Sequence, residues 1–420
     1  MSDGRRRAGT YEFGSHVVWV DFDELLKVET FEIDTNTDEA LKLEPFEVGK
    51  AFEHELGHYT QDLFTSFGAH HFHGARNAVK ATRAALPTKP AQWTQDMLKP
   101  LTGLCTSRAL MNLPVTFELH RRKAKQPVSW TFTTKEILEA DAMASVHELL
   151  SRMVVEGELS NLSSRNRARL ADDINARGYG LAYRATRSLV QTVAGLSDEE
   201  LYTHVKIGEH HVALGHGIHR LMVDYSLSVP FMTDPSWYAE CVPAHRFAAV
   251  ASAIHRMSAE DLADLVGQSM MRPEKAFDTL DGKCSFRHSS TASAHGWLDW
   301  MTALYEDTSD PLAWIRMNAM RYRIENYHVY MHRDPTCLIR EAGIPFFMFD
   351  TPPDRLVSFW PAGCQQDRAA TEAKVAWWDQ LLRMSVHAAS VTELDSAIGL
   401  VVSNMYNCSF AQQPKSDSLG

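Results

Sequence analysis

Long apolar runs, clustered cysteines and an excess of basic charge are all missing from this chain of 420 residues. Because no stretch of about 18 apolar residues occurs, we expect no membrane-spanning helix. The six cysteines are widely scattered, which excludes a dense disulfide framework and predicts reduced thiols. Asp and Glu (53) outnumber Lys and Arg (42), and the net charge of −11 argues against a nucleic-acid or anionic-membrane partner.

Several signatures of common enzyme classes are also absent. The Gly-Lys pairs at 49–50 and 282–283 lack the upstream glycine and following Ser or Thr of a phosphate loop. The pair Gly178-x-Gly180 lacks the third glycine of a dinucleotide-binding turn, and no G-x-S-x-G nucleophile elbow occurs. The basic start Met1–Ala8 is followed by no apolar stretch, so we expect no secretory signal peptide and predict a soluble, cytoplasmic protein.

Hydrophobic periodicity predicts an α+β fold that is predominantly helical, with a small N-terminal sheet packed on one helix. Val17–Val20 and Thr30–Asp34 have the composition and alternation of short strands. A helical period begins near Pro45 and ends near Gly68, residues that suit a helix start and a helix end. Prolines interrupt residues 74–130, for which we predict only short helices.

The rest of the chain is predicted to be mainly helical. Thr133-Thr-Lys-Glu136 is a capping box, which predicts a helix from about Thr134 to Val155. The further expected elements are amphipathic helices over 165–270, a helix over 311–330, a strand over 344–349 and a helical pair over 372–404.

The motif that carries chemistry is His54-Glu55-Leu56-Gly57-His58, an H-E-x-x-H inside the first predicted helix. Side chains four residues apart differ by about 40° in direction and lie about 6 Å apart along a helix axis, so both imidazoles can meet one ion. Glu55 lies about 100° round the helix, where it can take a proton from a water on the metal. The spacing therefore predicts His54 and His58 as metal ligands and Glu55 as the general base.

A catalytic zinc needs a third protein ligand and an open position. A metzincin would carry Gly at 61 and His at 64, but the sequence has Gln61 and Phe64, which excludes that class. Glu139 is the candidate, because it shares a helix face with an otherwise apolar stripe and a buried carboxylate needs a compensating partner. The small side chains of Ala140, Ala142 and Ala144 would let its helix approach the first one closely.

His54-Glu-x-x-His58 followed on a later helix by Glu139-Ala-Asp-Ala142 resembles the gluzincin branch of the zincin metallopeptidases. Members of that group carry H-E-x-x-H on one helix and a Glu followed by small residues, often E-x-x-A, on the next. The resemblance implies that His54, His58 and Glu139 bind zinc and that Glu55 is the general base.

Two departures from the family pattern leave the third ligand open. Leu138 stands where the family usually has Asn before the ligand Glu, and Met143 stands where an Asp would follow. Glu136 and Asp141 therefore remain alternatives to Glu139.

From these features we expect a zincin-like, metal-binding catalytic lobe over 1–165, a mainly helical lobe over 166–411 that forms the other cleft wall, and a flexible tail over 412–420. The predicted function is zinc-dependent hydrolysis of a peptide or amide bond in a peptide-like or small-molecule substrate, with no nucleic-acid or membrane partner. The same two His and one Glu also suit Fe²⁺ in a non-haem oxygenase. A non-enzymatic binding protein with structural histidines is the third hypothesis.

Other histidines and tyrosines are weaker candidates. His70-His-Phe-His73 offers a second metal site or a pocket rim, although an exposed turn is the favoured interpretation. In the cluster that starts at His210-His211, His216 and His219 are three residues apart and are candidates for substrate contact or oxyanion donation. The segment 327–332 offers further oxyanion donors, although a core role is favoured there.

Overall fold

The computed structural model describes residues 9–20, 46–82, 110–119, 127–155, 193, 195, 204–207, 210–230, 240–284, 286, 290–305, 309–330, 335–350, 355–362, 364 and 366–388. Within these ranges no helix combines the length and the apolar character needed to cross a membrane. Four cysteines lie in this part of the chain and all are free thiols, as their scattered spacing predicts: Cys241, Cys284, Cys337 and Cys364.

The described part of the chain is predominantly helical with small sheets, as predicted. Its strands are β1 (Gly9–Tyr11), β2 (Val18–Val20), β3 (Val115–Leu119), β4 (Val128–Phe132), β5 (His204–Ile207), β6 (His210–Ala213), β7 (Phe346–Asp350) and β8 (Arg355–Phe359). Its helices are α2 (Phe46–Phe64), α3 (Ser66–Thr82), α6 (Thr134–Val155), α10 (Leu214–Leu227), α11 (Pro243–His255), α12 (Ala259–Met271), α13 (Pro273–Cys284), α14 (Ser290–Tyr305), α15 (Pro311–Glu325), α16 (Tyr327–Tyr330), α17 (Pro335–Glu341) and α18 (Arg368–Ala388).

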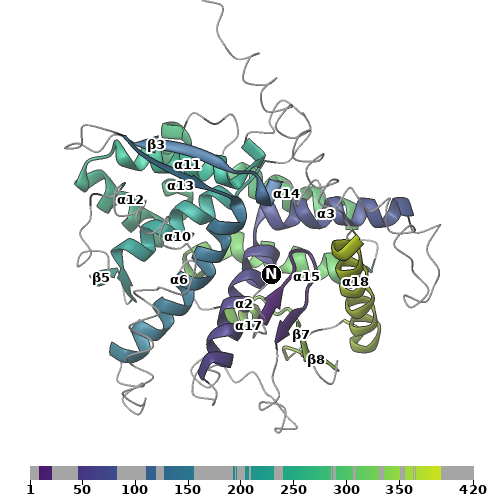
Figure 1. Cartoon of the computed structure of the whole chain (residues 1–420). Helices are drawn as coiled ribbons and strands as arrows, with labels where there is room; N and C mark the ends of the chain where they lie inside the picture. The colour runs from purple at the N-terminus through teal and green to yellow at the C-terminus, as the bar shows by residue number, and fades with distance from the viewer. Residues whose placement is uncertain are drawn as a thin grey trace, which may run out of the picture.

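Helices α2 and α6 run side by side through the middle of the molecule (Figure 1). The sheet that contains β7 and β8 lies on the far side of α2 from α6, whereas α10 to α13 lie beyond α6 (Figure 1). The helix pair is therefore placed between a sheet and a helical layer.

The sheet beside α2 has the order β1-β2-β7-β8. Strand β2 pairs antiparallel with β1 and parallel with β7, and β7 pairs antiparallel with β8. The prediction of an N-terminal sheet was therefore incomplete, because half of its strands come from residues 346–359. The strand predicted over 344–349 is β7, shifted by two residues at its start.

Aromatic side chains join this sheet to α2. The ring of Tyr59 on α2 meets the rings of Tyr11 and Phe346 edge to face, with centroids 5.7 and 5.2 Å apart. The Tyr59 hydroxyl donates a hydrogen bond to the Pro345 carbonyl at 3.1 Å, so this buried phenol is satisfied. A small sheet thus packs on the helix that carries His54 and His58.

The first long helix ends earlier than predicted, at Phe64 rather than Gly68. The chain bends at Thr65, whose hydroxyl donates to the Gln61 carbonyl (2.6 Å), and α3 then begins at Ser66. Gly68 is not a helix cap: a Cβ there would lie 1.7 Å from the Asp62 carbonyl oxygen, so only glycine fits this contact.

A buried ion pair fixes α2 against α15. The carboxylate of Asp62 lies 2.9 Å from the Arg316 guanidinium, and both side chains are fully buried. Asp62 also accepts hydrogen bonds from the Tyr11 hydroxyl (2.6 Å) and the Gly14 backbone N–H. Burial raises the pKa of the Asp62 carboxyl, but the neighbouring Arg316 outweighs it and holds the pKa below its ordinary value.

Two hairpins occur where helices were predicted. Strands β3 and β4 pair antiparallel from Val115↔Phe132 to Leu119↔Val128, so the prediction of only short helices over 74–130 was wrong. The signal was present, because β3 alternates buried and exposed residues along its five positions. Strands β5 and β6 likewise interrupt the helical stretch predicted over 165–270.

The later predicted elements are largely confirmed. Helix α6 has the predicted bounds, and α15 with α16 covers the predicted 311–330 with a break at Asn326. Helix α18 accounts for the first part of the predicted pair over 372–404. Four predictions lie outside the described residues: the strand at Thr30–Asp34, the second part of the helical pair over 372–404, the lobe boundary at 165 and the flexible tail over 412–420.

Candidate metal centre

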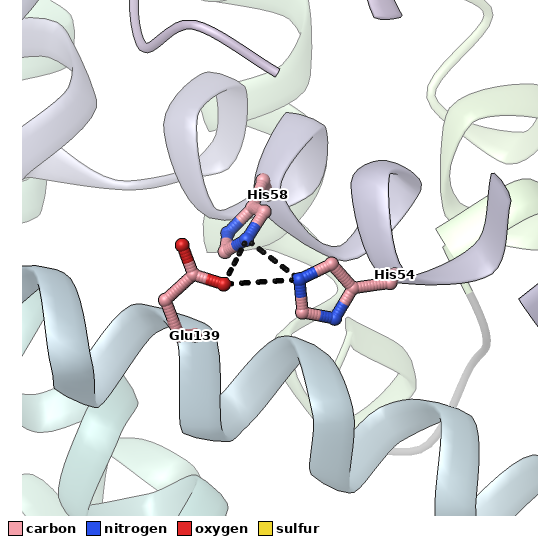
Figure 2. A group of neighbouring side chains, drawn as sticks. All are labelled: His54, His58 and Glu139. Atoms are coloured by element: carbon pink, nitrogen blue, oxygen red, sulfur yellow. Dashed lines mark hydrogen bonds and ion pairs between the residues drawn. The ribbon is translucent and has the colours of Figure 1, made fainter. Parts of the chain in front are cut away.

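Three predicted ligands meet between α2 and α6. His54 and His58 project from α2 towards Glu139 on α6 (Figure 2). The Nε2 atoms of His54 and His58 lie 3.1 and 3.4 Å from Glu139 Oε2. The two Nε2 atoms are 3.2 Å apart, and the three side chains form a group that could hold a metal ion.

The spacing of these three atoms matches the requirements of a tetrahedral metal. Ligands about 2.0–2.1 Å from a zinc ion stand about 3.3–3.4 Å from one another along the edges of a tetrahedron. The three separations of 3.1, 3.2 and 3.4 Å are close to that edge. Two imidazole lone pairs aimed at each other repel, so a proton or a cation between them is needed to stabilise this arrangement.

A close approach of the two helices brings Glu139 within reach. A Cβ on Gly57 would lie 3.1 Å from both Cα and Cβ of Ala142. The glycine between the two histidines thus packs directly against the alanine three residues after Glu139. The prediction that small residues let α6 approach α2 is confirmed at Ala142.

The electrostatics of the group favour a positive charge among the ligands. Burial raises the pKa of Glu139, but hydrogen bonds with His54 and His58 outweigh it and hold that pKa far below its ordinary value. Burial lowers the pKa of His58, but the Glu139 carboxylate outweighs it, so the pKa of His58 is raised. The Glu139 carboxylate therefore stays ionised beside the two imidazoles.

Glu55 lies beside the ligand group and is buried. Burial raises the pKa of its carboxyl, an effect that His58, His54 and a backbone hydrogen bond from Tyr11 only partly offset. A buried carboxyl whose pKa is raised takes up a proton more readily than a free one, which is a property that a general base and acid requires. The Tyr11 contact, which ties β1 to this carboxyl, was not foreseen, and no local sequence pattern would have revealed it.

The ligand group is open on one side. The side chains of His54 and His58 are 14% and 9% exposed, whereas that of Glu139 is 43% exposed. The two imidazoles do not project into solvent from the outer face of α2. The Glu139 side is therefore the more exposed side of the group.

The two alternative third ligands have other partners. Glu136 closes the predicted capping box, since its carboxylate accepts from the Thr133 N–H (2.7 Å) and its own N–H donates to the Thr133 hydroxyl. Asp141 accepts a hydrogen bond from the Gln61 amide at 2.8 Å and lies 3.7 Å from His219. Among the three candidate carboxylates only Glu139 meets the two histidines.

The candidate closest to the H-E-x-x-H motif in sequence is the cluster His70–His73. His70–His73 lies within α3 and not in an exposed turn, and His71 is buried, so the favoured interpretation was wrong. The error arose because the helical period was taken to end at Gly68. These histidines belong to no metal-binding group of the described residues.

Two of the predicted oxyanion donors belong to the core. Tyr327 and Tyr330 are buried, and Tyr327 donates to Asp224, whose other oxygen lies 2.8 Å from Arg323. His216 and His219 both lie on α10, and His219 is buried next to Asp141. His332 lies outside the described residues.

Gln61 was missed as a site residue, since position 61 entered the sequence argument only to exclude metzincins. Its amide oxygen lies 2.9 Å from Nδ1 of the candidate ligand His58. The available signal was its spacing, because a residue three positions after a ligand lies on the same helix face.

Comparison with known proteins gives no match, whether to a family, to a curated protein or to a solved structure.

Proposed function

We propose that this protein is a zinc-dependent hydrolase that cleaves a peptide or amide bond in a gluzincin-like site. The observation that supports the proposal is the convergence of two imidazole nitrogens and one carboxylate oxygen at separations of 3.1–3.4 Å. Two His and one carboxylate with an open side is a donor set typical of catalytic zinc.

The roles follow from the positions of the side chains. His54, His58 and Glu139 would hold the ion, which supplies Lewis acidity for a carbonyl and lowers the pKa of water. Glu55 takes the proton of the attacking water and passes it to the leaving amine. Its raised pKa suits both transfers, because the group must be ionised at the first and protonated at the second.

The test separates catalysis from metal binding. We expect Glu55→Gln to retain its metal and to lose about 10²–10⁴-fold in kcat/KM. The assay is cleavage of a mixed fluorogenic peptide library, followed by mass spectrometry of the products. The control is Glu118→Gln, which makes the same change on the exposed face of β3 and leaves activity intact. A Glu55→Gln protein that binds metal and cleaves at the wild-type rate would exclude this role.

Fe²⁺ in a non-haem oxygenase is the alternative for the same three ligands. Elemental analysis of purified protein separates the two, because stoichiometric iron with oxygen-dependent turnover would favour the oxygenase. A cytoplasmic location stays a prediction from the N-terminal sequence, and a peptide-like or small-molecule substrate stays a prediction from the H-E-x-x-H motif.

A further inference from the structure

The orientation of the Gln61 amide is determined by its neighbours. Its Nε2 lies 3.1 Å from the Leu138 carbonyl oxygen and 2.8 Å from Asp141 Oδ2, and both of these atoms are acceptors. The NH₂ group must therefore face α6, which leaves Oε1 facing His58 Nδ1 at 2.9 Å. Gln61, Asp141 and His58 are all buried, so water does not compete for these bonds.

This amide orientation determines which nitrogen of His58 carries the proton. Because Gln61 Oε1 can only accept, His58 Nδ1 must donate to it. In the neutral ring the proton is then on Nδ1, and Nε2, which faces His54 and Glu139, is left with a lone pair for a cation. The hydrogen bond from Nε2 to Glu139 belongs to the ring that is protonated on both nitrogens. The buried Nδ1 of His54, by contrast, has no hydrogen-bond partner among the residues that the structure describes. The chain therefore orients His58 more firmly than His54.

We propose that Gln61 and Asp141 are positioning residues for the metal centre, an inference that rests on the proposed function. Asp141 holds the Gln61 amide in one orientation, and the amide holds His58 in the tautomer that offers Nε2 to a divalent cation. The same bonds join α2 to the segment 138–141 of α6. One chain of hydrogen bonds from Asp141 through Gln61 to His58, called the relay below, therefore holds both the histidine ring and the helix that carries Glu139 in position. Outer partners of this kind typically contribute 10–100-fold in metal affinity.

The test compares zinc affinities by competition with a chromophoric chelator. We expect Gln61→Leu to raise the zinc dissociation constant by about 10–100-fold, because His58 loses the acceptor for its Nδ1 proton. Gln268→Leu on α12 is the matched control and should bind zinc as the wild type does. Asp141→Asn keeps an acceptor oxygen for Gln61 and should also retain nearly wild-type affinity.

A double-substitution cycle separates the relay from a general loss of stability. We expect Asp141→Leu to weaken zinc binding, and the double variant Gln61→Leu/Asp141→Leu to bind zinc within about threefold of Gln61→Leu alone. The reason is that Asp141 acts through Gln61. In the double variant neither Gln61 nor Asp141 remains as the unpaired partner of the other, which limits the loss of stability if one single variant fails to fold. Losses that simply multiply in the double variant would contradict the relay.

Histidine side-chain ¹⁵N spectra of the metal-free protein, recorded at alkaline pH, give a readout that needs no zinc. We expect His58 to carry its proton on Nδ1 in the wild type and to show a mixture of tautomers in Gln61→Leu. A wild-type ring protonated on Nε2, or a folded Gln61→Leu protein with unchanged zinc affinity, would overturn the relay. A wild-type protein that binds no zinc would instead overturn the proposed function, while the tautomer still reports on Gln61.

Discussion

Replacing Gly57 by alanine tests the helix spacing on which the metal centre depends. The added Cβ would lie 3.1 Å from Cα and Cβ of Ala142. Carbon atoms pack comfortably at about 3.5–4.0 Å, so α2 and α6 must separate locally by roughly 0.4–0.9 Å. Metal–ligand distances tolerate only about 0.2 Å, which is less than this displacement. We therefore expect the zinc dissociation constant of Gly57→Ala to rise at least about tenfold, or about 1.4 kcal/mol.

The stability of the metal-free Gly57→Ala protein is measured beside its zinc affinity, so that displaced ligands are distinguished from a general loss of folding. Alanine favours the helix by about 0.5–1 kcal/mol over glycine, whereas overpacking costs about 1–3 kcal/mol, so the net loss is about 0–2.5 kcal/mol. Gly267→Ala on α12 is the matched control, because a Cβ there meets nothing within 4 Å. It should stabilise the protein slightly and leave zinc affinity unchanged. Wild-type zinc affinity in Gly57→Ala, measured by chelator competition, would refute the reasoning.

Four further predictions concern stability, each measured by chemical denaturation. Arg316→Met leaves Asp62 charged and unpaired in the core, so we expect a loss of about 3–5 kcal/mol. Because the pKa of Asp62 is lowered in the folded state, its contribution to stability is present above about pH 4 and is lost as the pH falls below it. Asp62→Asn should therefore make the free energy of unfolding less dependent on pH in this acidic range. An unchanged dependence on pH would contradict the pairing of Asp62 with Arg316. Gly68→Ala forces a Cβ against the Asp62 carbonyl and should cost at least about 2 kcal/mol, whereas a neutral result would show that the contact relaxes freely. Thr133→Ala removes the cap of α6 and should cost about 1 kcal/mol without altering zinc affinity, and a large affinity change would mean that the cap also positions Glu139.

Local patterns predicted the elements that carry the candidate site. The i, i+4 spacing of His54 and His58 and the capping box at Thr133 depend on residues close together in the chain, and both appear in the structure as expected. Glu139 was selected because a carboxylate on an apolar stripe needs a partner, and it lies 3.1 Å from His54.

Features that depend on distant pairing could not be predicted. Strand β2 pairs with β7 more than 300 residues later in the chain, and no local pattern specifies that partner. The buried pair of Asp62 and Arg316 joins segments that are 254 residues apart. Gln61 is a different case, because its side chain gains a role only when α6 supplies Leu138 and Asp141 as acceptors. The sequence shows that position 61 carries an amide, but only the contact with α6 determines that its NH₂ group faces α6 and its oxygen faces His58.

X-ray absorption at the zinc edge, with metal analysis of the same zinc-loaded protein, tests most directly whether His54, His58 and Glu139 bind one ion. We predict one equivalent of zinc with two imidazole nitrogens at about 2.0–2.1 Å and a carboxylate oxygen at about 2.0–2.2 Å, lost in His58→Ala and weakened in Glu139→Gln. Less than stoichiometric zinc after loading, or zinc retained with unchanged coordination in both variants, would contradict the proposed metal centre.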